Sequence, residues 1–320
     1  MPIDERTPSL RGVSVVIPTK NRAELLLQNL RSIDEQSTLA AEVIVADDGS
    51  TDETERVVRE FGARHLHNPR GDWRPSAARN AGMNAAHTPY VAFIDSDDLY
   101  HPLALERLHG ALAAHRSAPF AFGRGLSARP TPLGWQSDGV IGPREWELDD
   151  LLCSLYARNS VPSGGAMVRR ELALSLGGFD EQFVFAEDHA FWLKLARHGE
   201  PVHVPEIVGI HRRHTGNRMT PSISARYDRL ITETAISDKR LEGCVSRRLG
   251  VLACEMSSDA LHQRSLGNAL EAAKLLFNGS QRLDIARAAI AHWRMRRKGA
   301  GEGALLLEND TELGAWLATY

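Results

Sequence analysis

Three aspartates follow a strand-like run near residue 94, and their spacing suits the binding of a cation. Asp95, Asp97 and Asp98 come directly after residues 90–94 (YVAFI). A helix cap or a turn explains one such carboxylate, but carboxylates this close together repel one another. A divalent cation removes the repulsion, and oxygen ligands of this kind suit Mg²⁺ or Mn²⁺, which are commonly completed by water and substrate phosphates. The sequence therefore predicts a metal site that also receives a phosphorylated ligand.

Two earlier apolar runs also end in polar residues. Residues 13–17 (VSVVI) are followed by PTKNR, and residues 42–46 (EVIVA) by DDGS. Nearly continuous apolar runs are typical of buried parallel strands, whose carboxyl ends meet at one crevice. The residues expected in that crevice are Thr19, Asn21, Arg22, Asp47, Asp48, Asp95, Asp97 and Asp98.

Helical patterns lie between these runs. Asn21 with Glu24, and Ser50 with Glu53, resemble capping boxes, and the second of these helices is expected to end at Gly62. Alternation of strands and helices predicts an α/β fold with a mainly parallel sheet covered by helices on both faces.

The remainder of the chain changes character twice. Residues 117–146 are rich in Gly, Pro, Arg and Trp and predict irregular loops with short strands. From residue 221 strand patterns vanish and apolar residues recur at helical spacing. We expect a catalytic domain at 1–220 and a helical C-terminal extension at 221–320.

Composition excludes several classes of protein. Lys and Arg number 38 against 41 for Asp and Glu, so no basic field attracts nucleic acid. Cys153, Cys244 and Cys254 are odd in number and form no CxxC pair, which argues against a disulfide framework and favours a reducing cytosol. No stretch reads as a signal peptide or a membrane span, so we expect a soluble or peripherally attached protein in the cytoplasm.

Neither a GxxxxGK[ST] loop nor a GxGxxG loop follows the first strand, so P-loop and usual dinucleotide-binding enzymes are not supported. Six strings occur in order: VSVVIPTKNR, VIVADDGSTD, SAARNAGMNAA, YVAFIDSDDLYHP, GGFDEQF and AEDHAFWLKLARHG. Together they resemble the family 2 glycosyltransferases of the GT-A fold, which is Rossmann-like, over about residues 12–220. The resemblance implies a nucleotide-binding half at 12–98 and an acceptor-binding half at 99–220.

The resemblance also implies roles for single residues. Asp48 would accept a hydrogen bond from the nucleotide base, and Asp188 would act as the general base. A DxD motif falls on Asp95, Ser96 and Asp97, with Mn²⁺ or Mg²⁺ bridging the donor diphosphate. The resemblance implies that the nucleotide is bound by Pro18, Thr19, Asn21, Arg22, Asp48, Arg79, Asp95 and Ser96. It implies that the metal is held by Asp97, Asp95 and His214.

These roles imply an inverting transfer of a sugar from a nucleoside-diphosphate sugar, with UDP favoured, to a glycan, lipid-linked or small-molecule acceptor. Lys20 departs from the family pattern, since many relatives stack an aromatic residue on the base there. A sugar nucleotidyltransferase and a catalytically silent nucleotide-sugar-binding module are the alternatives. The first would ordinarily carry a glycine-rich loop after strand one, which PTKNR lacks.

For several residues a purely structural role is an alternative to the functional one. Asp188 suits a helix N-terminus, and His214 suits ordinary packing. Arg212 and Arg213 are candidate diphosphate contacts. Residues 163–165 offer either room for the donor sugar or a tight turn, while Trp135 and Trp146 fit acceptor stacking or core packing.

Residues 288–299 (AAIAHWRMRRKG) join an apolar face to a basic one. Such a helix suits either an anionic membrane at the inner face of the cell or packing against neighbouring helices, and homodimerisation through the tail is equally open.

Overall fold

The computed structural model describes residues 9–72, 74–132, 134–143, 148, 150–183, 185–214, 241, 244–263, 285, 289 and 311–320. The chain divides into two compact units. The first comprises Met1–Gly142, Val161–His214 and Gly303–Tyr320, and the second comprises Pro143–Ser160 and Thr215–Glu302.

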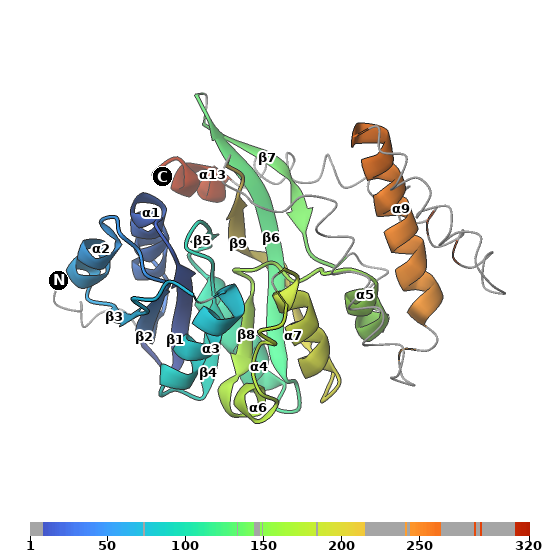
Figure 1. Cartoon of the computed structure of the whole chain (residues 1–320), viewed down its shortest axis with the longest axis horizontal. Helices are drawn as coiled ribbons and strands as arrows, with labels where there is room; N and C mark the ends of the chain where they lie inside the picture. Colours follow the sequence, from blue (N-terminus) through green and yellow to red (C-terminus); the bar gives the residue numbers. More distant parts are fainter. Residues whose placement is uncertain are drawn as a thin grey trace. The chain divides into compact units, whose positions relative to one another are not determined.

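The first unit begins with four parallel strands. They are β1 (Ser9–Thr19), β2 (Leu39–Asp47), β3 (Arg64–His67) and β4 (Tyr90–Phe93), in the order β3-β2-β1-β4. Helices α1 (Ala23–Asp34), α2 (Thr54–Phe61) and α3 (Pro75–Ala85) connect them (Figure 1). The predicted α/β fold is confirmed.

Both faces of the sheet are covered because alternate residues of β1 point to opposite sides. Val15 joins a core cluster with Leu30 of α1 and Leu108 of α4 (Ala104–Ala114). Val16 faces the other side and lies against Gly82 of α3. Helices therefore pack on both faces, as the sequence predicts.

The sheet continues with β8 (Ala166–Arg169), β6 (Phe120–Thr131), β9 (Val202–Arg212) and β5 (Leu99–Tyr100), while β7 (Gly134–Ile141) pairs with β6. The β6–β7 hairpin is antiparallel, whereas β6 and β9 are parallel. The expectation of irregular loops at 117–146 was wrong, since a long hairpin occupies most of that segment.

Three further helices occur between Leu151 and Ala196 in the sequence. These are α5 (Leu151–Ala157), α6 (Arg170–Ser175) and α7 (Glu187–Ala196). Phe179, Phe191 and Trp192 form an aromatic cluster with Phe93 of β4, and the Phe179 and Phe191 rings stack at 3.9 Å. This cluster buries the start of α7 against the sheet.

The predicted capping boxes do not form. Neither the Arg22 nor the Glu53 side chain caps the helix that follows it. Instead Asp52 serves both helices: its Oδ2 accepts from the Ala23 N–H at 2.9 Å and its Oδ1 from the Thr54 N–H at 3.1 Å. Gly62 ends α2 in the left-handed conformation with φ 82°, as predicted.

The second unit contains a disulfide between Cys153 of α5 and Cys244, just before α9 (Val245–Gln263). The sequence argued against a disulfide framework, but this bond is present; its separation of 91 residues gives no local signal. Arg248 reinforces the same junction by donating to the carbonyls of Tyr156 and Ala157, both at 3.0 Å.

The helical extension contains α9 and α13 (Thr311–Leu317) among the described residues. Helix α13 lies within the first unit, where Leu313 and Leu317 pack with Leu99, Leu126 and Ile210. Nearly all of the basic stretch predicted at 288–299 lies outside the described residues, as does Trp146. Within the described part of the chain, every helix is too short or too polar to span a bilayer.

Candidate functional site

The polar loops converge because β1, β2 and β4 run parallel and end at the same edge of the sheet. Thr19 at the end of β1 pairs with Asp47 at the end of β2, and Val16 of β1 pairs with Phe93 of β4. The loops that carry Asn21, Asp48 and the aspartates after β4 therefore start side by side, as the sequence predicts.

Asp48 lies in a polar corner with Lys20 and Asn68. Its Oδ2 accepts from Lys20 Nζ at 2.8 Å, and its Oδ1 accepts from Asn68 Nδ2 at 3.2 Å. Lys20 also donates to the Gly71 carbonyl at 2.8 Å. Lys20, which departs from the family pattern, thus holds the acidic residue expected to read the base. Sequence reasoning missed Asn68, which gave no motif signal.

Asn21 joins the loops after β1 and β2. Its backbone is left-handed with φ 50°, its N–H donates to Ser50 Oγ at 2.8 Å, and its Oδ1 accepts from the Thr51 N–H at 2.8 Å. An asparagine tolerates this conformation better than most residues. Asn21 therefore shapes the loop in place of capping α1.

Arg79 of α3 is buried between two carboxylates. It donates to Asp95 Oδ1 at 2.6 Å and to Glu187 Oε1 at 2.7 Å, and its guanidinium lies 5.5 Å from the centre of the Phe179 ring. Burial alone would lower the pKa of Arg79, but Asp95, Glu187 and the nearby Asp188 raise it instead. Burial raises the pKa of Asp95, and Arg79 only partly opposes this effect.

Asp97 lies between Arg22 and His214. Its Oδ2 accepts from Arg22 and lies 3.0 Å from Nε2 of His214, which follows β9 in the chain. Burial would raise the pKa of Asp97, but Arg22 and His214 outweigh it and the pKa falls below its usual value. The predicted ligands Asp97 and His214 are therefore in direct contact, while Asp95 contacts Arg79.

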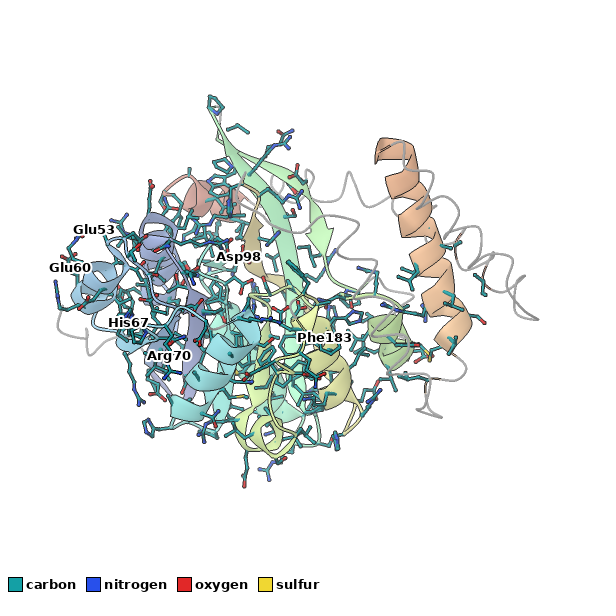
Figure 2. All side chains as sticks on the ribbon, in the orientation of Figure 1. Glu53, Glu60, His67, Arg70, Asp98 and Phe183 are labelled. Atoms are coloured by element: carbon teal, nitrogen blue, oxygen red, sulfur yellow. A yellow bond between two sulfur atoms is a disulfide. The ribbon has the colours of Figure 1, made fainter. Side chains whose placement is uncertain are left out.

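Asp98, labelled in Figure 2, has a different role from its neighbours. Its Oδ1 accepts from the Arg212 N–H at 3.0 Å, and its Oδ2 accepts from Ser163 Oγ at 2.8 Å. His211 Nδ1 lies 3.2 Å from Oδ1. Burial lowers the pKa of His211, but Asp98 more than offsets this and raises it to about 9. Asp98 thus anchors β9 beside the site.

Buried polar side chains of α1 and β9 hold the loop after β4 in place. Asn29 of α1 donates through Nδ2 to the carbonyls of Asp95 at 3.1 Å and Asp98 at 2.8 Å. The Arg212 guanidinium, which the sequence suggested for diphosphate, donates to the Asp97 carbonyl, to Gln28 and to the Leu25 carbonyl. Arg212 therefore holds the loop against α1.

Asp188 is the second residue of α7, directly after Glu187. Ala186 precedes the helix in the left-handed conformation with φ 56°, which is strained for alanine and recurs at functional sites. Asp188 Oδ1 accepts from the His189 N–H at 2.7 Å. The Arg79–Glu187 ion pair thus links the start of α7 to Asp95.

The remaining predicted residues lie in or near the strands, pack elsewhere or are exposed. Pro18 pairs with Ala46 within β1 and β2, and Thr19 and Ser96 are both buried. Gly165 serves packing, because a Cβ there would lie 2.2 Å from Pro162 Cγ. Trp135 packs against an apolar cluster around β9, as its plainer interpretation suggested. Arg213 is exposed.

Residues 14–176 match the family described as Glycosyl transferase family 2, and this segment is just over half of the chain. The chain belongs to glycosyl transferase family 2. The family recognised from the six strings is thereby confirmed.

The chain resembles parts of longer proteins. It is 39% identical over 107 residues to chondroitin synthase of Escherichia coli, covering 32% of this chain and 16% of that protein. It is 32% identical over 219 residues to pre-mycofactocin glycosyltransferase of Mycobacterium tuberculosis, covering 65% of this chain and 44% of that one. The chain spans less than half the length of either relative.

Solved structures share the fold of this chain. TarS residues 1–349 of S. aureus in complex with UDP-GlcNAc aligns with a TM-score of 0.61 at 19% identity, covering 95% of this chain and 92% of that chain. The mannosyltransferase PcManGT of Pyrobaculum calidifontis, in complex with GDP-Man and Mn²⁺, aligns with a TM-score of 0.54 at 19% identity, covering 88% and 86%. The GT-A fold is therefore confirmed.

Proposed function

We propose that this glycosyltransferase moves a sugar, with inversion at the anomeric carbon, from a nucleoside-diphosphate sugar to an acceptor nucleophile. The contact between Asp97 Oδ2 and His214 Nε2 at 3.0 Å carries the proposal, since it joins the end of the DxD motif to the distant histidine that family resemblance selects. The TarS complex with UDP-GlcNAc supports a UDP sugar as donor.

Asp97 and His214 fit a divalent cation. A carboxylate oxygen and an imidazole nitrogen are donors that Mn²⁺ accepts, and Mg²⁺ suits the carboxylate. The complex of PcManGT with GDP-Man and Mn²⁺ supports Mn²⁺ as the ion. When bound, such an ion supplies Lewis-acid neutralisation of the leaving diphosphate. Arg22, which donates to Asp97, adds a second positive charge to the same place.

The corner of Asp48, Lys20 and Asn68 is suited to a uracil ring. Asp48 offers carboxylate oxygens to the imide N–H, while Lys20 and Asn68 offer donors that ring carbonyls accept. Lys20 thus replaces stacking with charge-assisted hydrogen bonding.

Asp188 acts as the general base in this proposal. It takes the proton from the acceptor nucleophile as that atom bonds to the anomeric carbon, while the bond from that carbon to the diphosphate breaks on the opposite face. Arg79 and Glu187 hold α7 in place by their 2.7 Å ion pair. Proton transfer of this kind is worth roughly 10²- to 10⁴-fold in rate.

We also propose that residues 12–98 hold the donor and 99–220 the acceptor, with 221–320 as the helical extension. The acceptor is drawn from glycans, lipid-linked intermediates or small molecules, and the site of action is the cytoplasm, including the inner face of its membrane. Homodimerisation through the C-terminal helices belongs to the same proposal.

The decisive experiment measures release of UDP from UDP sugars with Mn²⁺ and, separately, UDP binding by calorimetry. Asp188→Asn is expected to lower turnover by roughly 10²- to 10⁴-fold while UDP still binds. Asp180→Asn is the matched control, because Asp180 Oδ1 accepts from the Gln182 N–H, which an asparagine oxygen also does. Asp180→Asn should keep full activity.

Other outcomes assign the alternatives. Pyrophosphate release from a sugar phosphate and UTP identifies a nucleotidyltransferase. UDP-sugar binding with no turnover by the parent identifies a silent binding module. Unchanged Mn²⁺-dependent UDP binding after Asp97→Ala removes the basis of the proposal.

A further inference from the structure

Asp47 contacts two histidines on the neighbouring strand, away from the contact between Asp97 and His214. His65 Nε2 lies 3.0 Å, and His67 Nδ1 3.2 Å, from the same Oδ2 of Asp47. In the parallel pairing Asp47 lies opposite His67, and His65 lies two residues earlier on the same face of β3. One carboxylate oxygen and two imidazole nitrogens thus converge within 4.8 Å of one another.

The donor set is one that proteins use for zinc. Two histidines and one carboxylate, with an open position, form a recurrent zinc site. Ligand bonds of about 2.0–2.2 Å in tetrahedral geometry place neighbouring donor atoms roughly 3.3–3.5 Å apart. The two nitrogens of His65 and His67 already lie near that separation from Oδ2 of Asp47.

The surroundings orient the carboxylate and leave access for an ion. Asp47 Oδ1 accepts from the Ser50 N–H at 2.9 Å, which directs Oδ2 toward the histidines. The Asp47 side chain is 1% exposed, whereas those of His65 and His67 are 22% and 43% exposed. An ion can therefore arrive from solvent, and water can complete its coordination.

The cluster is separate from the Asp97–His214 site. Strands β2 and β1 lie between β3 and β4 in the sheet, and Figure 2 shows His67 and Asp98 well apart. Its ligands also differ: two imidazoles favour Zn²⁺, while Mg²⁺ prefers oxygen.

We propose that Asp47, His65 and His67 form a second divalent-metal site that takes Zn²⁺ and fastens β3 to the end of β2. Asn68 follows His67 in the chain. Its backbone N–H donates to the Asp47 carbonyl at 2.8 Å, and its Nδ2 donates to Asp48 Oδ1. The ion therefore holds in place the corner proposed above for base recognition. The inference goes beyond the transferase reaction.

The test uses the full chain carrying Asp97→Ala and His214→Gln, which removes the other metal site, with no nucleotide present. Titration with ZnCl₂ against a chromophoric chelator is expected to show about one tightly bound ion per chain, as in a single three-ligand site. Adding His65→Gln and His67→Gln should weaken that binding by at least ~100-fold, because losing a metal ligand costs more affinity than losing a residue that only orients one.

His87→Gln is the matched control. His87 also lies beside a carboxylate, with Nδ1 3.5 Å from Glu42 Oε2, but it is a single exposed histidine. Zinc binding should be unchanged in this variant.

Circular dichroism and thermal unfolding verify that each variant is folded. If the variant with both His65→Gln and His67→Gln does not fold, the variant with His67→Gln alone is used in its place. Substituting Co²⁺ for Zn²⁺ in the parent should give the visible absorption of four-coordinate cobalt. Failure of the Asp97→Ala, His214→Gln chain to bind Zn²⁺ overturns the inference and shows a hydrogen-bonded cluster without an ion. Zinc binding that survives loss of both histidines overturns it as well.

Discussion

Arg79 contributes to stability as well as to the proposed donor site, because it is the shared partner of two carboxylates. It contacts Asp95 and Glu187 at 2.6 and 2.7 Å, and its own side chain is 7% exposed. Removing one member of a buried ion pair leaves an uncompensated charge. We expect Arg79→Met to lower the free energy of unfolding by about 3 kcal/mol in urea denaturation.

Arg56 provides the control for that measurement. It also contacts two carboxylates, Glu53 and Glu60 at 2.9 and 2.8 Å, but its side chain is 50% exposed. Arg56→Met should leave the free energy of unfolding nearly unchanged, because surface ion pairs contribute little. Equal losses in the two variants would show that burial is not the deciding factor.

His203 of β9 makes stability depend on pH. Burial, reinforced by Arg124 and opposed by Glu206, lowers the pKa of His203 from 6.5 to about 4. The unfolded chain therefore binds a proton that the folded chain resists, so stability is retained above pH 6.5 and lost as the pH falls toward 4.

Comparison of the parent with His203→Gln isolates this effect. Because His203 is partly exposed, its pKa shift contributes less than its full value to stability. We therefore expect the free energy of unfolding of the parent to fall by about 1–2 kcal/mol more than that of the variant across that pH window. Urea denaturation at a series of pH values measures it, with His115→Gln as an exposed control. Parallel pH profiles for parent and His203→Gln would contradict the prediction.

At the scale of elements, the contact of α3 with β1 depends on Gly82. A Cβ added there would lie 2.3 Å from Val16 Cγ1. Alanine is the better helix former, but overpacking outweighs that gain, and we expect Gly82→Ala to lower the free energy of unfolding by about 1–3 kcal/mol.

Gly110 of α4 is the matched position. It also lies inside a helix, but no atom lies within 4 Å of an added Cβ. Gly110→Ala should raise the free energy of unfolding by about 0.5–1 kcal/mol. Thermal denaturation of both variants tests the pair, and the prediction fails if the two changes have the same sign.

The parallel half of the sheet was predictable from sequence because buried parallel strands are continuous apolar runs. The run at 13–17 shows this pattern within β1. The ends of such strands were also predictable, since the carboxylates of Asp48, Asp95 and Asp97 are too costly to bury in an apolar core. The carboxylates of the site were therefore found by their position after strands.

The rest was hidden for identifiable reasons. β3 reads RHLH, so no apolar pattern marks it as a strand. In β6, Gly123 and Gly125 allow the close approach of Val208 and Pro162, and these glycines resemble loop residues in the sequence. The partnership of Arg79 with Glu187 spans 108 residues, which local spacing cannot reveal.

At the scale of the molecule, the disulfide between Cys153 and Cys244 constrains the second unit. It closes a separation of 91 residues, and loops of this length typically contribute about 2–4 kcal/mol. We expect Cys153→Ser with Cys244→Ser to lower the free energy of unfolding of that unit by this amount under oxidising conditions.

Dithiothreitol should lower the free energy of unfolding of the parent by the same amount and should not change that of the double variant. The sequence predicts a reducing compartment, where such bonds are rare. Thiol titration of unfolded protein isolated from the cell tells which state is present, and three reactive thiols per chain would match the cytoplasmic proposal.

The path of the sheet ends in strands of only four and two residues, β3 and β5. An unpaired strand margin is a template on which another molecule can add its own backbone, and short or polar margins discourage this. Arg64 and the imidazoles of β3 make that margin hydrophilic. The four residues of β3 therefore also help to keep copies of this chain from aggregating through their sheets.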